Sequence, residues 1–160
     1  MKKIVSILVI VLFVMVHVTA MAGSTVTAAT SYNPDQATNY KNKVIKITIA
    51  DEASPVAAVT TTLSETDVLG YFLCSMETVP GSTAPTNDFD VTLSTAGGVD
   101  ILGGAGANLD SPTPNVVYPT IDSTTGQKGC VPVNSALTLS FSGNSVANAT
   151  ATINFFFTRP

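Results

Sequence analysis

The sequence contains no tryptophan and a single histidine, His17, which lies in the predicted leader. The expected mature chain therefore has no histidine, which excludes Ser-His-Asp and Cys-His catalytic sites and zinc sites that use histidine. Paired acids, such as Asp88 with Asp90 or Asp100 with Asp110, remain as candidates for glycoside chemistry. Because aromatic residues are few, little surface is left for stacking a sugar. We expect a protein that is not an enzyme and needs no cofactor.

The acidic residues do not form a recognisable metal motif either. Calcium could bind to several carboxylate oxygens, but the sequence has no EF-hand loop, so solvated carboxylates in turns are the favoured interpretation. The run Gly103–Gly106 lacks the Lys-Ser/Thr ending of a phosphate-binding loop, and no helix is expected after it. We therefore predict no metal site and no nucleotide site.

Charged residues make up only 11% of the chain. From Gly23 onward there are five basic and eleven acidic residues, which is a formal net charge of −6. Three of the five cations lie close together, at Lys41, Lys43 and Lys46. An acidic chain without a basic stripe is not expected to bind nucleic acid.

The first 22 residues have the three-part pattern of a secretory signal peptide. Lys2 and Lys3 precede an apolar run over residues 4–18, and small residues offer cleavage sites after Ala20 or Ala22. An uncleaved membrane helix is the alternative, for which the run is slightly short. The pattern predicts a secreted protein, extracellular or on the cell surface, with the periplasm as a further location and no membrane contact after cleavage.

The two cysteines, Cys74 and Cys130, are 56 residues apart. An even number of cysteines in an exported chain favours one disulfide, and two buried free thiols are the alternative. A closed loop of this size stabilises the folded state by roughly 4 kcal/mol in the loop-entropy model. The expected role of the bond is structural.

Residues 23–42 are rich in Ser, Thr, Ala and Asn, and Tyr32 and Tyr40 are their only large aromatic side chains. Such a segment buries too little surface to offset its ordering entropy alone. It is expected to be a flexible N-terminal arm, or else an arm that becomes ordered only on a neighbouring subunit. Gly23, Tyr32 and Tyr40 are the candidate assembly residues in the second case.

Residues 43–160 are expected to form one antiparallel β-sandwich, Ig-like or jelly-roll-like, with seven to nine short strands and no helix. The clearest pattern is alternation of apolar and polar residues, as in Ile45, Ile47 and Ile49. The expected strands cover residues 44–50, 56–63, 68–76, 88–94, 99–102, 115–118, 137–141 and 149–158. The first two are predicted to form a hairpin, and 68–76 to be a central strand covered on both faces.

The glycine-rich stretch at residues 97–107 is expected to organise the chain around it. Five of its eleven residues are glycine, and only Val99, Ile101 and Leu102 are large enough to fill a core. Glycine tolerates backbone conformations that other residues avoid. The stretch predicts a turn, a short strand and a tight connection.

Several loop motifs resemble a family of small β-rich structural proteins of tailed bacteriophages and prophages, most of which have no assigned function. The similar segments are Gly70–Leu73, Thr78–Leu93, Gly98–Asn108, Leu137–Leu139 and Ser142–Asn144. The resemblance covers about residues 44–157 and implies a virion-type structural module without catalytic residues. A signal peptide departs from that pattern, since virion proteins assemble in the cytoplasm.

The expected function is that of a secreted structural protein, a self-assembling subunit of an extracellular filament or surface layer. Exchange of the N-terminal arm between subunits would join them, since pairing at a sheet edge needs only backbone groups. The expected partner is therefore a second copy of the chain. The alternatives are a monomeric extracellular module that binds glycan or protein through residues 80–87 and 103–114, and a phage-derived virion accessory protein.

Overall fold

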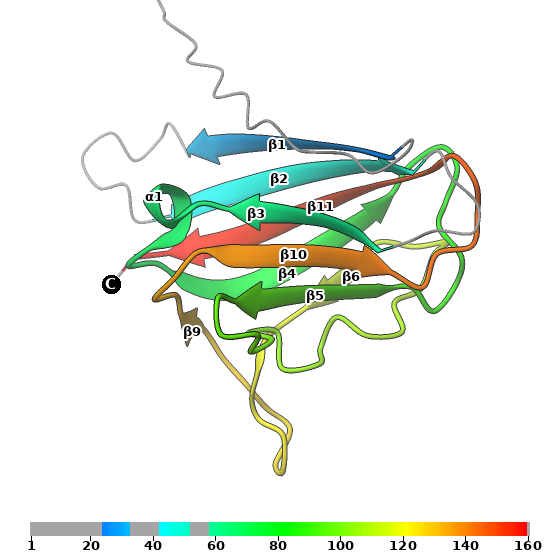
Figure 1. Cartoon of the computed structure of the whole chain (residues 1–160). Helices are drawn as coiled ribbons and strands as arrows, with labels where there is room; N and C mark the ends of the chain where they lie inside the picture. Colours follow the sequence, from blue (N-terminus) through cyan, green and yellow to red (C-terminus); the bar gives the residue numbers. More distant parts are fainter. Residues whose placement is uncertain (1–23, 33–41, 52–57, 160) are drawn as a thin grey trace, which may run out of the picture.

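A computed structural model describes residues 24–32, 42–51 and 58–159 of the chain (Figure 1). The predicted signal peptide, Gly23 and Tyr40 lie outside the described residues. The elements, in chain order, are β1 (Ser24–Tyr32), β2 (Asn42–Asp51), β3 (Val59–Leu63), α1 (Glu65–Val68), β4 (Phe72–Pro80), β5 (Asp90–Thr95), β6 (Asn115–Val117), β7 (Thr120–Asp122), β8 (Gln127–Lys128), β9 (Val131–Pro132), β10 (Leu137–Ser142) and β11 (Ala149–Thr158).

Two antiparallel sheets form the layers of a β-sandwich (Figure 1). Sheet A has the strand order β1-β2-β11-β4-β6, and β9 also pairs with β4. Sheet B has the order β3-β10-β5, while β7 and β8 form a separate hairpin. The predicted all-β class is confirmed. Seven of the strands in the described residues are five residues or longer, and the additional strands are short pairings of two or three residues.

The core lies between the sheets and uses one face of each long strand. Ile45, Ile47 and Ile49 on β2 are fully buried, as the alternation predicts. On β11 the buried positions are also every second residue, and the register places Ile153 opposite Ile47 and Phe155 opposite Ile45. Sheet B contributes the facing side chains, listed here: Val59, Leu63, Val91, Leu93, Leu137, Leu139 and Phe141.

The predicted hairpin between residues 44–50 and 56–63 is wrong. The two strands, β2 and β3, belong to different sheets, because β2 is already paired with β1 and β11 and has no free edge. β3 pairs with β10 instead, with Leu63 opposite Leu137. Each strand has one apolar face, and placing them in facing sheets buries both faces in one core.

The apolar run 68–76 is not one strand covered on both faces. Its start belongs to α1, a single helical turn with acidic residues in its first turn, where they favour the helix dipole. Gly70 then has a positive φ of 77° and donates a backbone hydrogen bond to Val133 O. Only from Phe72 does the chain run as β4, and only one face of β4 is buried. Val68 is fully buried although it lies in α1. Buried helical turns and buried strands both give runs of apolar residues, so the sequence of 68–76 does not show where the helix ends and the strand begins.

The glycine-rich stretch forms turns along the open edge of β5 rather than a strand over 99–102. Asp100 causes this, since its Oδ1 accepts hydrogen bonds from Leu93 N and Leu102 N and its Oδ2 accepts one from Gly104 N. Ile101 and Leu102 are buried as expected, whereas Val99 is exposed. The loop therefore covers an edge that would otherwise be free to pair.

Cys74 and Cys130 form the expected disulfide, with Cα atoms 4.1 Å apart. The bond joins β4 to the residue before β9, at the base of the β7–β8 hairpin, which Figure 1 shows as the yellow segment extending below the sandwich. It therefore fixes the long excursion 103–130 to sheet A.

Alanine substitutions at two glycines test how the glycine-rich stretch packs against β5. A Cβ on Gly106 would lie 2.1 Å from Val91 O, the same residue whose N–H donates to Gly106 O. We expect Gly106→Ala to lower the free energy of unfolding by about 2 kcal/mol, because backbone must move to admit the methyl group. The measurement is urea unfolding followed by circular dichroism.

Gly97→Ala is the matched control, since its Cβ would meet nothing closer than 3.8 Å. We expect its free energy of unfolding to stay within about 0.5 kcal/mol of the parent protein. Equal effects of the two substitutions would contradict the described contact between Gly106 and β5.

Candidate functional site

β1 occupies the outer edge of sheet A and pairs with β2 alone (Figure 1). The pairing is antiparallel and unbroken over nine residue pairs, from Ser24 opposite Asp51 to Tyr32 opposite Lys43. β1 lies within the segment expected to be a flexible arm, or an arm that becomes ordered on a neighbouring subunit, and the structure gives residues 24–32 as a paired edge strand. The physical reason is that an edge strand is held by its backbone ladder, which does not depend on large apolar side chains.

Of the three candidate assembly residues, only Tyr32 lies within the described part of the chain. Its backbone is opposite Lys43, at the end of β1 where the chain leaves the sheet. Nine residues, 33–41, connect β1 to β2. Hairpin connections are commonly two to five residues long, so this connection is long for two neighbouring strands.

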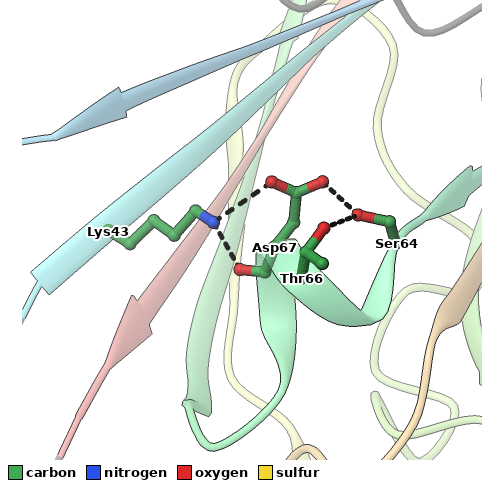
Figure 2. A network of polar contacts seen from close by, with 4 residues as sticks. All are labelled: Lys43, Ser64, Thr66 and Asp67. Carbon is green, nitrogen blue, oxygen red and sulfur yellow. Dashed lines mark hydrogen bonds and ion pairs between the residues drawn. The ribbon is translucent and has the colours of Figure 1, made fainter.

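Lys43, which faces the core beside the end of β1, is the buried charge that the sequence analysis missed. It is only 2% exposed, and its Nζ donates hydrogen bonds to Asp67 O and, at 3.5 Å, to Asp67 Oδ1 (Figure 2). Asp67 Oδ2 in turn accepts a hydrogen bond of 2.5 Å from the Ser64 hydroxyl. The network ties β2 of sheet A to α1, which follows β3 of sheet B.

Tyr71 completes this cluster from the start of the segment leading into β4. Lys43 Nζ lies 5.5 Å from the centroid of its ring, and Arg159 Cζ lies 4.5 Å from it. The ring also makes an edge contact with Phe157, with centroids 6.5 Å apart. Two cations therefore lie within contact distance of one electron-rich ring, the arrangement of a cation–π interaction.

Burial lowers the pKa of the Lys43 ammonium below its ordinary value of 10.5. Asp67 opposes this shift through its charge and its hydrogen bond, and the positive charge of Arg159 lowers the pKa further. The charged form is the one stabilised by Asp67, whereas desolvation favours the neutral amine. The protonation state of Lys43 is therefore linked to the packing of α1 against β2.

One signal in the sequence could have identified Lys43. The period of two that makes Ile45, Ile47 and Ile49 face the core also assigns residue 43 to the same face. In the sequence, Lys43 also belongs to a short cationic cluster with Lys41 and Lys46, which is typical of an exposed segment. Its partner could not be found, because Asp67 is 24 residues away and lies on an unpredicted helical turn.

In each acidic pair considered for catalysis, one carboxylate accepts backbone hydrogen bonds. Asp90 Oδ1 accepts a hydrogen bond of 2.9 Å from Asn108 N, and both oxygens of Asp100 hold the glycine-rich loop. Among the described residues, no three His, Cys, Asp or Glu side chains are grouped so that they could hold a metal ion. The role of Asp90 and Asp100 that these contacts show is to hold the conformation of the neighbouring loops.

The two loops proposed for ligand binding lie together at one end of the sandwich. Asp88 N donates to Leu109 O at 3.0 Å, and Ser111 N donates to Asn87 Oδ1 at 3.1 Å. Asn144, from the turn before β11, accepts a hydrogen bond of 2.9 Å from Thr86 N. The loops are therefore ordered by hydrogen bonds to one another.

Within the described residues, no helix has the length and apolar character required to span a membrane. The disulfide between Cys74 and Cys130 is compatible with an extracellular protein. No protein-family model, curated protein or solved structure is significantly similar to the chain. The resemblance to phage structural proteins therefore stays a prediction.

The buried lysine generates a prediction on pH dependence. Because its pKa is lower in the folded than in the unfolded chain, the unfolded chain binds more protons between the two values. The free energy of unfolding therefore gains a contribution from Lys43 as pH rises from neutral toward 10.5. We expect Lys43→Met to reduce this rise, measured by urea unfolding at a series of pH values.

Lys128→Met serves as the control, since Lys128 is exposed on the β7–β8 hairpin. It is expected to keep the pH dependence of the parent protein. A pH profile that is identical in the parent protein and in Lys43→Met would show that Lys43 does not titrate differently on folding.

Proposed function

We propose that the protein is a secreted structural subunit that assembles into a homopolymer by exchanging β1 between neighbouring copies. The observation that carries the proposal is the unbroken pairing of β1 along β2 at the edge of sheet A. The same backbone hydrogen bonds form whether β1 comes from the same chain or from another copy. Exchange therefore needs no contact that the fold does not already contain.

The length of the connection supports exchange. Nine residues separate β1 from β2, and a chain of that length reaches about 30 Å when extended. That distance exceeds the spacing of several strands in a sheet, so β1 can reach the edge of a neighbouring copy. Each chain then has both a donor strand, β1, and an acceptor strand, β2. Because each copy can donate to one neighbour and accept from another, the head-to-tail contact can repeat indefinitely.

The chemistry of the remaining surface is consistent with a structural role. The chain from Gly23 onward has no histidine, and its charged residues are few. The leader pattern and the disulfide of Cys74 and Cys130 both support an extracellular location.

The second candidate is a monomeric extracellular binding module. It rests on the hydrogen bonds that order the loops around Asn87, Leu109 and Asn144 at one end of the sandwich. Ordered loops on a rigid scaffold are the usual place for recognition. In this case β1 stays in its own chain.

Chains that each carry one added cysteine distinguish exchange from pairing within one chain. Thr27 is directly opposite Thr48 across β1 and β2, at a separation that a disulfide can span. We expect co-secreted Thr27→Cys and Thr48→Cys chains to form a covalent heterodimer, because each chain alone lacks a second new cysteine. The measurement is non-reducing gel electrophoresis with identification of the linked peptides by mass spectrometry.

The matched control is a mixture of Thr48→Cys and Thr152→Cys chains. Thr152 is also directly opposite Thr48, but both residues lie on internal strands, β11 and β2. This pair should form no heterodimer between chains. Absence of the Thr27–Thr48 heterodimer under conditions in which a single chain with both substitutions does close its disulfide would overturn the exchange proposal.

A further inference from the structure

The outer faces of the two sheets differ in chemistry. On sheet B every outward residue of β3, β10 and β5 carries a hydroxyl group except Asp90. On sheet A the outward positions of β2, β11 and β4 combine apolar and hydroxyl side chains with only two charges. These positions include Val44, Lys46, Thr48, Ser75, Glu77, Val79, Thr152, Asn154 and Phe156.

The two charges on the outer face of sheet A lie in one row across the strands. Asn154 on β11 is opposite Lys46 on one side and opposite Glu77 on the other. Asn154 Nδ2 donates a hydrogen bond of 3.0 Å to Glu77 Oε2. Within the described residues the only ion pair is that of Lys43 with Asp67, so Lys46 and Glu77 do not form one with each other.

Two exposed apolar side chains lie beside the row. Val116 on β6 is opposite Glu77 and is 54% exposed, and Phe156, two residues beyond Asn154 on β11, is 36% exposed. The exposed valine and phenylalanine and the pair of opposite charges give this face both apolar and charged groups for a contact with another protein. The hydroxyl-bearing face of sheet B has no such residues.

We propose that the outer face of sheet A binds the same face of a second copy of the chain, with Lys46 of each copy opposite Glu77 of the other. The two residues lie on opposite sides of the middle strand, β11. A two-fold axis parallel to β11, midway between two stacked sheets, brings β2 of one copy over β4 of the other at the same height. Both charge pairs then form at once, and the contact is isologous.

The same axis passes close to β11, so Asn154 and Phe156 lie against their own counterparts. Phe156 meets the partner's Phe156, which buries two exposed rings, and Asn154 lies between the two charge pairs. Three strands about 4.8 Å apart make a small contact area, at the lower end of stable interfaces. This contact does not rest on the exchange of β1, and it would join assembled chains side by side.

Charge reversal tests the proposal in the intact mature protein. Sedimentation velocity over a series of protein concentrations measures the dimerisation constant of the parent protein and of Lys46→Glu, Glu77→Lys and the double variant. By symmetry each single substitution replaces two attractions with two repulsions, so we expect each to weaken dimerisation about ten-fold or more. The double variant should restore it, because the pairs form again with their signs exchanged.

Two controls carry the same charge changes elsewhere. Lys128→Glu lies on the β7–β8 hairpin and Glu65→Lys lies on α1, and both residues are exposed. They should leave dimerisation unchanged, and all variants should keep the circular dichroism spectrum of the parent protein. Dimerisation of the parent protein should also weaken with added salt.

The proposal fails if the parent protein shows no association other than exchange-linked polymers, or if the double variant does not restore what the single variants lose. The cysteine assay for β1 exchange is expected to be unaffected by Lys46→Glu and Glu77→Lys. A heterodimer in that assay with no charge-dependent association would overturn only the present inference, and the reverse result would overturn only the exchange of β1.

Discussion

The pairing of β2 with β11 is the interaction on which the rest of the structure depends. These are the two ten-residue strands, and their register holds from Ala149 opposite Asp51 to Thr158 opposite Asn42. A slip of one residue would turn Ile45, Ile47 and Ile49 out of the core. With this ladder in place, β11 receives β4 on its other edge, and β2 is left with one edge that β1 occupies. The buried faces of both strands then define the surface against which sheet B packs.

The edge of β2 connects stability with the proposed function. Without β1, the nine residues of β2 that it pairs with, 43–51, would leave their backbone groups unpaired along that edge, which is a template for pairing with another chain. A strand from the N-terminal segment satisfies these backbone groups. Because the pairing uses only backbone groups, small hydroxyl-bearing side chains suffice in that strand. The buried Lys43 lies where β1 ends and joins β2 to α1 through Asp67. In the proposed exchange, the acceptor strand β2 is therefore anchored at the end where the donor strand β1 leaves the sheet.

The sequence predicts the parts of the fold that follow from alternation. The strands carrying Ile45–Ile49, Phe89–Leu93 and Ala151–Phe157 are confirmed because burial of every second residue is a local signal. The pairing partners are not local, so the hairpin of β2 with β3 was wrong. Asp100 turned an expected strand into a series of turns by accepting three backbone hydrogen bonds, which composition does not reveal. The candidate site was half predicted: the arm was identified from its sequence, but its strand and the burial of Lys43 depend on tertiary structure.

The central claim is that β1 completes the sheet of a neighbouring copy. Electron microscopy of the native secreted protein, with helical reconstruction of any filaments, tests it most directly. The account predicts filaments in which the strand beside β2 of each subunit is continuous with the preceding subunit through residues 33–41. Particles that are single sandwiches, each with its own N-terminal strand in place beside β2, would contradict it.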